Sequence, residues 1–210
     1  MNERSLYLYT YNFRGMSKAE KTKQFIIEQA APVFMTRGIA GTSVTDLMQV
    51  TKMSKGSLYV HFANKEELAV SVAAYNLELF VAKCLEAVQE FKTPKERMIG
   101  MLEFLSDPLH PPVAGGCPMM NFAMEADDTD PVILGKVAKT ISDVQSFFSI
   151  TVEEGIQEGQ FKKTWDAKIF AIKAYAMMEG GILISRASQN IDQMGILIGL
   201  IKAEVEENSL

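Results

Sequence analysis

The amino-acid sequence predicts an all-α protein made of two helical parts. Apolar residues recur at helical spacing from about Ser17 to the C-terminus, and no segment of that stretch alternates convincingly as a strand. A run rich in proline and glycine, DPLHPPVAGGCP at residues 107–118, is the main interruption of the pattern. Charge divides the chain as well, because residues 1–65 carry a net charge of +5 and residues 66–210 one of −10. A basic end on an acidic body indicates that this end meets a polyanion.

Composition sets limits on the protein class. With 210 residues, 48% of them hydrophobic, the chain is long enough for one large helical domain or for a small and a medium one. No uninterrupted apolar run approaches the ~18 residues of a membrane span, and the N-terminus lacks the pattern of a secretory signal. Cys84 and Cys117 lie far apart and show no metal-ligand spacing. We therefore expect a cytoplasmic protein without membrane contact, cofactor or metal.

The N-terminal 16 residues stand apart from the rest. Tyr7, Tyr9, Tyr11 and Phe13 alternate as in a short strand, but no partner strand follows, and Met16 would itself serve as a start. Two interpretations stay open: residues 1–16 are a tail or misplaced start, or they form an ordered arm.

A first helix is expected from about Ser17 to Arg37. Pro32 should kink it, because proline removes one backbone donor, and Gly38 should end it. The residues expected on its inner side are Phe25, Ile26, Ala30, Val33 and Phe34.

Two short helices follow, joined by a tight turn at Lys52-Met53. Either Thr42 or Ser43 caps the first, and Ser54 caps the second. The apolar anchors are Val44, Leu47 and Met48 in the first helix and Leu58 and Phe62 in the second. These dimensions are those of a helix-turn-helix, although similar hairpins occur in many helical proteins.

Longer helices fill the rest of the chain. Asn64 and Glu67 form the capping box of a helix from Lys65 to about Phe91. Further helices are expected at about 94–106, 119–126, 131–158, 166–188 and 191–207. The helix at 166–188 is apolar on nearly every face, so it must be covered on more than one side, most simply by a second subunit.

The run from Ala30 to Leu68 resembles the N-terminal domain of TetR-family transcriptional regulators. Its landmarks are Phe34, Gly38, Thr42-Ser43, the KGSLY run at 55–59, His61-Phe62 and Lys65-Glu66. The resemblance implies a three-helix DNA-binding domain at 17–63 and a helical effector-binding and dimerisation domain at 64–210. It also implies phosphate contacts from Thr42, Ser43, Tyr59 and Lys65, and base or groove contacts from Ser54, Lys55, Gly56, Ser57 and His61.

The resemblance further implies a homodimeric repressor that binds a palindromic double-stranded DNA operator and is released by a small-molecule effector. An apolar or aromatic effector is favoured, since methionines and phenylalanines are frequent in the body. The residues expected to line its pocket are Met101, Phe104, Cys117, Met120, Phe122, Phe147 and Met177. Those expected at the dimer interface are Ile172, Met177, Gly180, Gly181, Ile184, Ile191, Met194, Ile198 and Ile201.

Several residues carry an alternative interpretation. Cys117 is either a redox-sensing thiol or, as is commoner, a small buried residue. The acidic residues at 125–130 could bind a cation, but an acidic loop that caps a helix start is the commoner case, and His110 is expected in a loop. An enzyme or carrier that shares the helical fold is the other alternative. The chain shows no nucleophile–base pattern or phosphate loop, and we predict that it is not an enzyme.

Overall fold

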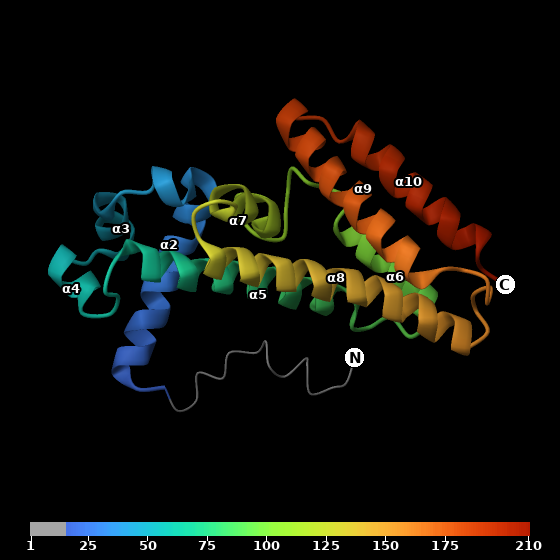
Figure 1. The fold of residues 1–210 in the computed structure, drawn as a ribbon, viewed down its shortest axis with the longest axis horizontal. Coiled ribbons are helices and arrows are strands. Elements are labelled where there is room, and N and C mark those ends of the chain that lie inside the picture. The colour runs from blue at the N-terminus through green and yellow to red at the C-terminus, as the bar shows by residue number, and fades with distance from the viewer. Residues whose placement is uncertain (1–15) are drawn as a thin grey trace. The chain divides into compact units, whose positions relative to one another are not determined.

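The computed structural model describes residues 16–210, so both interpretations of the N-terminal tail lie outside the described residues. The described chain is all-α, as predicted, with one isolated antiparallel bridge between Phe161 and Ser209 (Figure 1). Its helices are α2 (Lys18–Gly41), α3 (Val44–Thr51), α4 (Lys55–Tyr59), α5 (Lys65–Val88), α6 (Pro94–Phe104), α7 (Pro118–Ala126), α8 (Pro131–Gln157), α9 (Ala167–Ser188) and α10 (Asp192–Glu207).

Capping residues mark the starts of α3, α4 and α5. Ser43 caps α3, and Ser54 caps α4, because each side-chain oxygen accepts a hydrogen bond from a backbone N–H of the first turn. The alternative prediction, that Thr42 caps α3, is wrong. Asn64 caps α5 as predicted, but Glu67 completes the cap by accepting from the N–H of Ala63 rather than from that of Asn64.

Contacts divide the chain into two compact units. One, the head unit, contains the described residues up to Ala82 together with Val113–Lys139, and the other, the body unit, contains Lys83–Pro112 and Thr140–Leu210. The division falls within α5 and within α8. It does not coincide with the expected boundary at residue 64, because α2 packs against α7 as well as against α3.

In the head unit α2 supplies much of the core. Ile26, Ala30 and Phe34 are buried as predicted, whereas Phe25 is 43% exposed and does not face inward. The backbone stays helical through Pro32, and the one non-helical residue inside α2 is Gly38, with φ 77°. Gly38 thus interrupts the helix where the sequence predicts its end.

The long helix α5 is buried on its apolar positions, with Leu68, Val72, Leu77 and Phe80 all in the core. Among the described helices it alone is long and apolar enough to span a membrane by length and composition. Core helices of folded proteins satisfy the same criterion.

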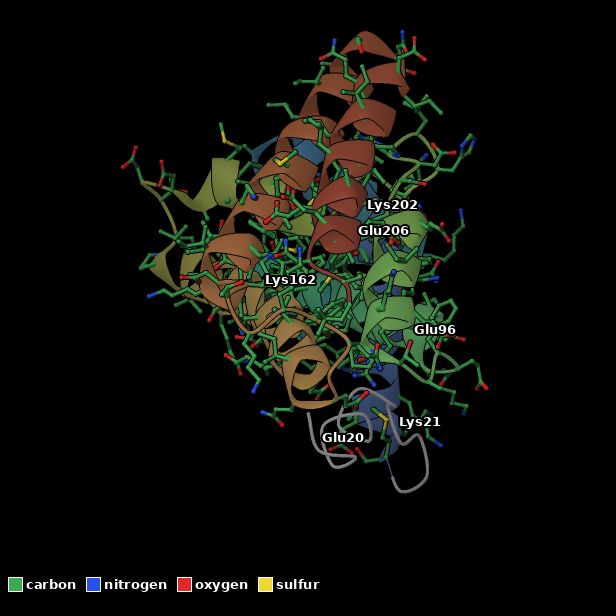
Figure 2. The ribbon with its side chains drawn as sticks, turned by 90° about the vertical axis from the view of Figure 1, so that its right-hand side faces the viewer. Glu20, Lys21, Glu96, Lys162, Lys202 and Glu206 are labelled. Atoms are coloured by element: carbon green, nitrogen blue, oxygen red, sulfur yellow. The ribbon has the colours of Figure 1, made fainter. Side chains whose placement is uncertain are left out.

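In the body unit α9 and α10 form an antiparallel pair. Met194, Ile198, Ile201 and Val205 of α10 are buried, and an added Cβ at Gly181 of α9 would lie 2.4 Å from the sulfur of Met194. Ion pairs tie α6 to α10: Lys95 to Glu206 at 2.8 Å and Lys202 to Glu103 at 2.7 Å (Figure 2 labels Lys202 and Glu206).

Candidate nucleic-acid interface

The helix-turn-helix of α3 and α4 is fixed by a shared apolar core. Phe34, Leu47, Leu58 and Phe62 are each at most 5% exposed, as the sequence predicts. Lys52 ends α3 in the left-handed conformation, with φ 56°, and this turn directs the chain into α4. The position of α4 is therefore set by packing on its inner side.

The outer side of α4 carries residues that have no role in that core. Lys55, Gly56, Tyr59 and Val60 are exposed, and we call these four residues the reading face. The Lys55 ammonium lies 5.9 Å from the centre of the Tyr59 ring, so the two side chains share one flank of the helix. A lysine and a phenol can each donate hydrogen bonds to phosphate or to base edges.

The remaining predicted contact residues lie within or next to α3 and α4. Ser54 and Ser57 are linked to each other, since their hydroxyl oxygens lie 2.9 Å apart and the N–H of Ser57 donates to the Ser54 hydroxyl. His61 is half-buried and its N–H donates to the carbonyl of Leu58. Ser43 lies exposed at the start of α3, where its hydroxyl donates to Asp46.

Gly56 has open space around it. A Cβ added there would meet no atom within 4 Å, so nothing inside the protein requires a glycine at this position of α4. A glycine interior to a helix costs about 0.5–1 kcal/mol relative to alanine. Gly56 is the second residue of α4, so the cost there is at most of this size, and no contact inside the described chain offsets it.

Lys65, for which the resemblance implies a phosphate contact, has two hydrogen-bond partners inside the fold. Its ammonium donates to the carbonyls of Ile39 and Thr42, at 2.9 and 3.0 Å, and so binds the C-terminal end of α2. The Thr42 side chain is 1% exposed and donates to the carbonyl of Gly38 at 2.6 Å. The resemblance implies a phosphate contact from Thr42. Its hydroxyl is instead buried and forms a hydrogen bond inside the fold.

Glu125 of α7 also binds the end of α2, through backbone N–H groups instead of carbonyls. One of its carboxylate oxygens accepts from the N–H groups of Ile39 and Ala40, at 2.7 and 3.1 Å. The neighbouring Asn121 donates to the carbonyl of Met35 at 3.1 Å. Sequence reasoning missed this contact, since a glutamate in an acidic stretch carries no sign of a partner far away in the chain.

Some charged side chains of the head unit pair with each other, and others are exposed. Arg37 pairs with Asp46 at 2.5 Å. Hydrogen bonds from Ser43 lower the pKa of Asp46, and Arg37 lowers it further. Lys18, Lys21, Lys52 and Lys55 are exposed basic residues of this unit.

The other predicted features occupy ordinary structural positions. Asp130 accepts from the N–H groups of Val132 and Ile133 and caps α8, as the acidic-loop interpretation predicts. His110 lies in a loop beside Asp107. No group of three or more His, Cys, Asp or Glu residues suited to a metal occurs among residues 16–210.

The predicted effector-pocket residues fall in both units. Met101, Phe104, Phe147 and Met177 belong to the body unit, and Cys117, Met120 and Phe122 to the head unit. Phe122 is fully buried, whereas Phe104 is 37% exposed. An open groove of about 410 Å³ in the body unit includes Phe91, Ile99 and Gln160, and none of the seven predicted pocket residues lines it.

Both cysteines are buried. Cys117 is 5% exposed, in keeping with its interpretation as a small buried residue. Burial raises the pKa of the Cys84 thiol to about 12.

The predicted dimer residues separate into two sets. Gly181, Met194, Ile198 and Ile201 are buried within the chain by the pairing of α9 and α10. Ile172, Ile184 and Ile191 are exposed, Met177 is half-buried, and a Cβ added at Gly180 would meet nothing within 4 Å. The list of expected interface residues leaves out four further exposed apolar residues of these two helices: Ile169, Leu183, Ile196 and Leu200.

Comparison with known proteins adds independent information. The family "Bacterial regulatory proteins, tetR family" matches residues 26–72, and the family "Tetracyclin repressor-like, C-terminal domain" matches residues 94–198. The chain is 33% identical to a TetR-family transcriptional regulator from Cytophaga hutchinsonii, with a TM-score of 0.86 over 94% of this chain and 99% of that one. It is 25% identical over 179 residues to the HTH-type transcriptional repressor DhaR of Mycobacterium sp. (strain GP1), covering 81% of this chain and 87% of that repressor. A stretch of 76 residues, 36% of this chain and 38% of the relative, is 34% identical to the HTH-type transcriptional repressor KstR2 of Mycobacterium tuberculosis.

Proposed function

The chain belongs to the TetR family of bacterial transcriptional regulators, and we propose that it is a dimeric repressor that binds a palindromic operator and is released by a small-molecule effector. Family membership makes the chain a regulator rather than an enzyme. The proposal assigns DNA binding to residues 17–63, assigns effector binding and dimerisation to residues 64–210, and places the protein in the cytoplasm without membrane contact.

The reading face of α4 is the observation that carries the proposal. Leu58 fixes the inner side of the helix, and the outer side carries an exposed lysine, an exposed phenol and a glycine that the fold does not require. We assign base or groove contacts to Ser54, Lys55, Gly56, Ser57 and His61. We assign phosphate contacts to Ser43, Tyr59 and Lys65, and Lys65 also holds the end of α2 through its bonds to Ile39 and Thr42.

The exposed apolar faces of α9 and α10 support a homodimer. Leu183 and Leu200 are 56% and 57% exposed, and Gly180 allows another helix to approach closely. A twofold dimer presents two copies of α4 to successive major grooves, about one helical turn or a multiple of it apart. This geometry calls for a palindromic operator.

Release by an effector requires two states of the dimer that differ in the spacing of the two helix-turn-helix units. A ligand shifts the population only by its differential affinity for those states. The buried methionines and phenylalanines, such as Met101 and Phe122, favour an apolar or aromatic ligand.

Replacement of Lys55 by alanine tests the DNA-binding surface. We expect Lys55→Ala to weaken binding to a duplex selected by the wild-type protein by about 1–3 kcal/mol, because one base or phosphate contact is lost. The measurement is a fluorescence-anisotropy titration at two salt concentrations. Lys163→Ala removes the same charge from an exposed position of the body unit and is the matched control. Equal affinities of Lys55→Ala and Lys163→Ala would contradict the assignment.

A further inference from the structure

Val60 is the most exposed large apolar side chain of the helix-turn-helix. It is 79% exposed, while the apolar anchor two residues earlier, Leu58, is 5% exposed. The backbone of Val60 is helical, with φ −70° and ψ −29°, and the carbonyl of Leu58 accepts from the N–H groups of His61 and Phe62. Val60 therefore continues the helical backbone by one residue beyond Tyr59, the last residue of α4.

Helical geometry places Val60 on the same line as Gly56. Residues four apart lie on one face of a helix, and residues two apart point in nearly opposite directions. Gly56 and Val60 thus lie on the side of α4 opposite Leu58, with Lys55 and Tyr59 along one flank. A surface that meets α4 head-on meets Gly56 and Val60 first.

Gly56 and Val60 differ in what they offer a partner surface. Gly56 leaves open space, so the helix backbone can approach the partner closely at that point. Val60 has no donor or acceptor in its side chain, and its β-branched group has few rotamers. Contact with a partner is favourable for such a side chain only where the partner presents an apolar group. A polar group of the partner that is buried against valine loses its hydrogen bond to water.

The floor of the DNA major groove offers one apolar group, the C5-methyl of thymine. We propose that Val60 contacts the C5-methyl of a thymine in each half-site and thereby selects an A·T pair at that position. This inference rests on the proposed function, since it requires that α4 enters the major groove.

Removal of the thymine methyl tests the contact directly. The probe is a duplex selected by the wild-type protein from a random-sequence library, in which each thymine is replaced in turn by deoxyuridine. We expect one thymine per half-site at which replacement weakens wild-type binding about fourfold, the effect of one buried methyl group. The Val60→Ala variant should bind the thymine and deoxyuridine duplexes with equal affinity at that position.

Met124→Ala is the matched control, because Met124 is also 79% exposed and lies in the same unit. It should keep the fourfold response, and circular dichroism should show both variants folded. The inference is overturned if no thymine responds in the wild type, or if Val60→Ala responds as the wild type does. Failure of the wild type to select any duplex is a distinct result, which overturns the proposed function itself.

Discussion

Single residues of α4 and its two caps, Ser54 and Val60, differ in whether they have partners inside the fold. Leu58 and Ser54 have internal partners, whereas Gly56 has none and Val60 stands in solvent. Elsewhere the chain uses glycine for internal reasons: Gly115 has φ +95°, and an added Cβ there would lie 2.8 Å from the carbonyl oxygen of Met35. Nothing inside the protein requires a glycine at position 56, in keeping with the proposed groove contact there.

Replacement of Gly56 by alanine should therefore separate stability from binding. Alanine fits the open space and is the better helix former, so we expect the free energy of unfolding to rise by about 0.5–1 kcal/mol. DNA affinity should fall by about 1–3 kcal/mol, the usual cost of an extra methyl group in a close-packed contact. Urea unfolding and anisotropy titration measure the two effects.

Gly135→Ala provides the control for that comparison. Gly135 lies in α8 of the same unit, and an added Cβ there also meets nothing within 4 Å. It should match Gly56→Ala in stability and leave DNA affinity unchanged. Loss of stability in Gly56→Ala, or full retention of its affinity, would count against a groove contact.

At the scale of elements, side chains from two other helices hold the end of α2. Lys65 of α5 binds the carbonyls of Ile39 and Thr42, and Glu125 of α7 binds the N–H groups of Ile39 and Ala40. The held segment leads directly into Ser43, the cap of α3. The direction of the helix-turn-helix thus depends on two residues from outside α3 and α4.

The Glu125 contact predicts a local loss of protection on mutation. In Glu125→Ala the N–H groups of Ile39 and Ala40 lose their acceptor, and hydrogen bonds to a charged group contribute about 1.5–3 kcal/mol each at most. We expect faster amide exchange at these two residues, measured by NMR, together with a lower free energy of unfolding.

Asp128→Ala is the matched control, since it removes the same charge from an exposed position two residues after the end of α7. Exchange at Ile39 and Ala40 should stay slow in this variant. Identical exchange in the two variants would show that Glu125 does not hold the end of α2.

At the scale of the whole molecule, the last two helices carry two kinds of apolar face. One face is satisfied within the chain, where α10 presents Met194 and Ile198 to α9. The other face remains exposed, with Ile172 and Leu183 on α9 and Leu200 on α10. Large exposed apolar patches are typical of protein–protein interfaces.

Leu183→Glu should disrupt the homodimer without unfolding the chain. The side chain is 56% exposed in the monomer, so the charge stays in water there, but it would be buried without a partner in a dimer. Sedimentation equilibrium should give the mass of two 23.3 kDa chains for the wild type and of one for the variant.

Met124→Glu introduces the same charge at an exposed apolar residue of α7 and should sediment as the wild type does. A wild-type protein that sediments as a single chain at micromolar concentration would contradict the dimer. So would a Leu183→Glu variant that stays dimeric.

The sequence by itself determined the elements and the core of the helix-turn-helix. Caps such as Ser43 and Ser54, and apolar spacing such as that of Leu58 and Phe62, are local signals, because a helix start or face depends on residues a few positions apart. The outward residues of α4 follow from the same local pattern, since they are the positions that the apolar anchors leave free. The assignment of DNA contacts to them stays a prediction.

Only the tertiary structure decided which partners distant residues have. Thr42 and Lys65 both match the family pattern. The Thr42 hydroxyl, however, is buried and donates to the carbonyl of Gly38, and the Lys65 ammonium donates to carbonyls at the end of α2. Glu125 finds its partners 85 and 86 residues away, and the α10 stripe through Met194 faces its own chain rather than solvent. Sequence periodicity shows that a face is apolar or a residue charged, but packing between helices far apart in the sequence determines what that face or charge meets.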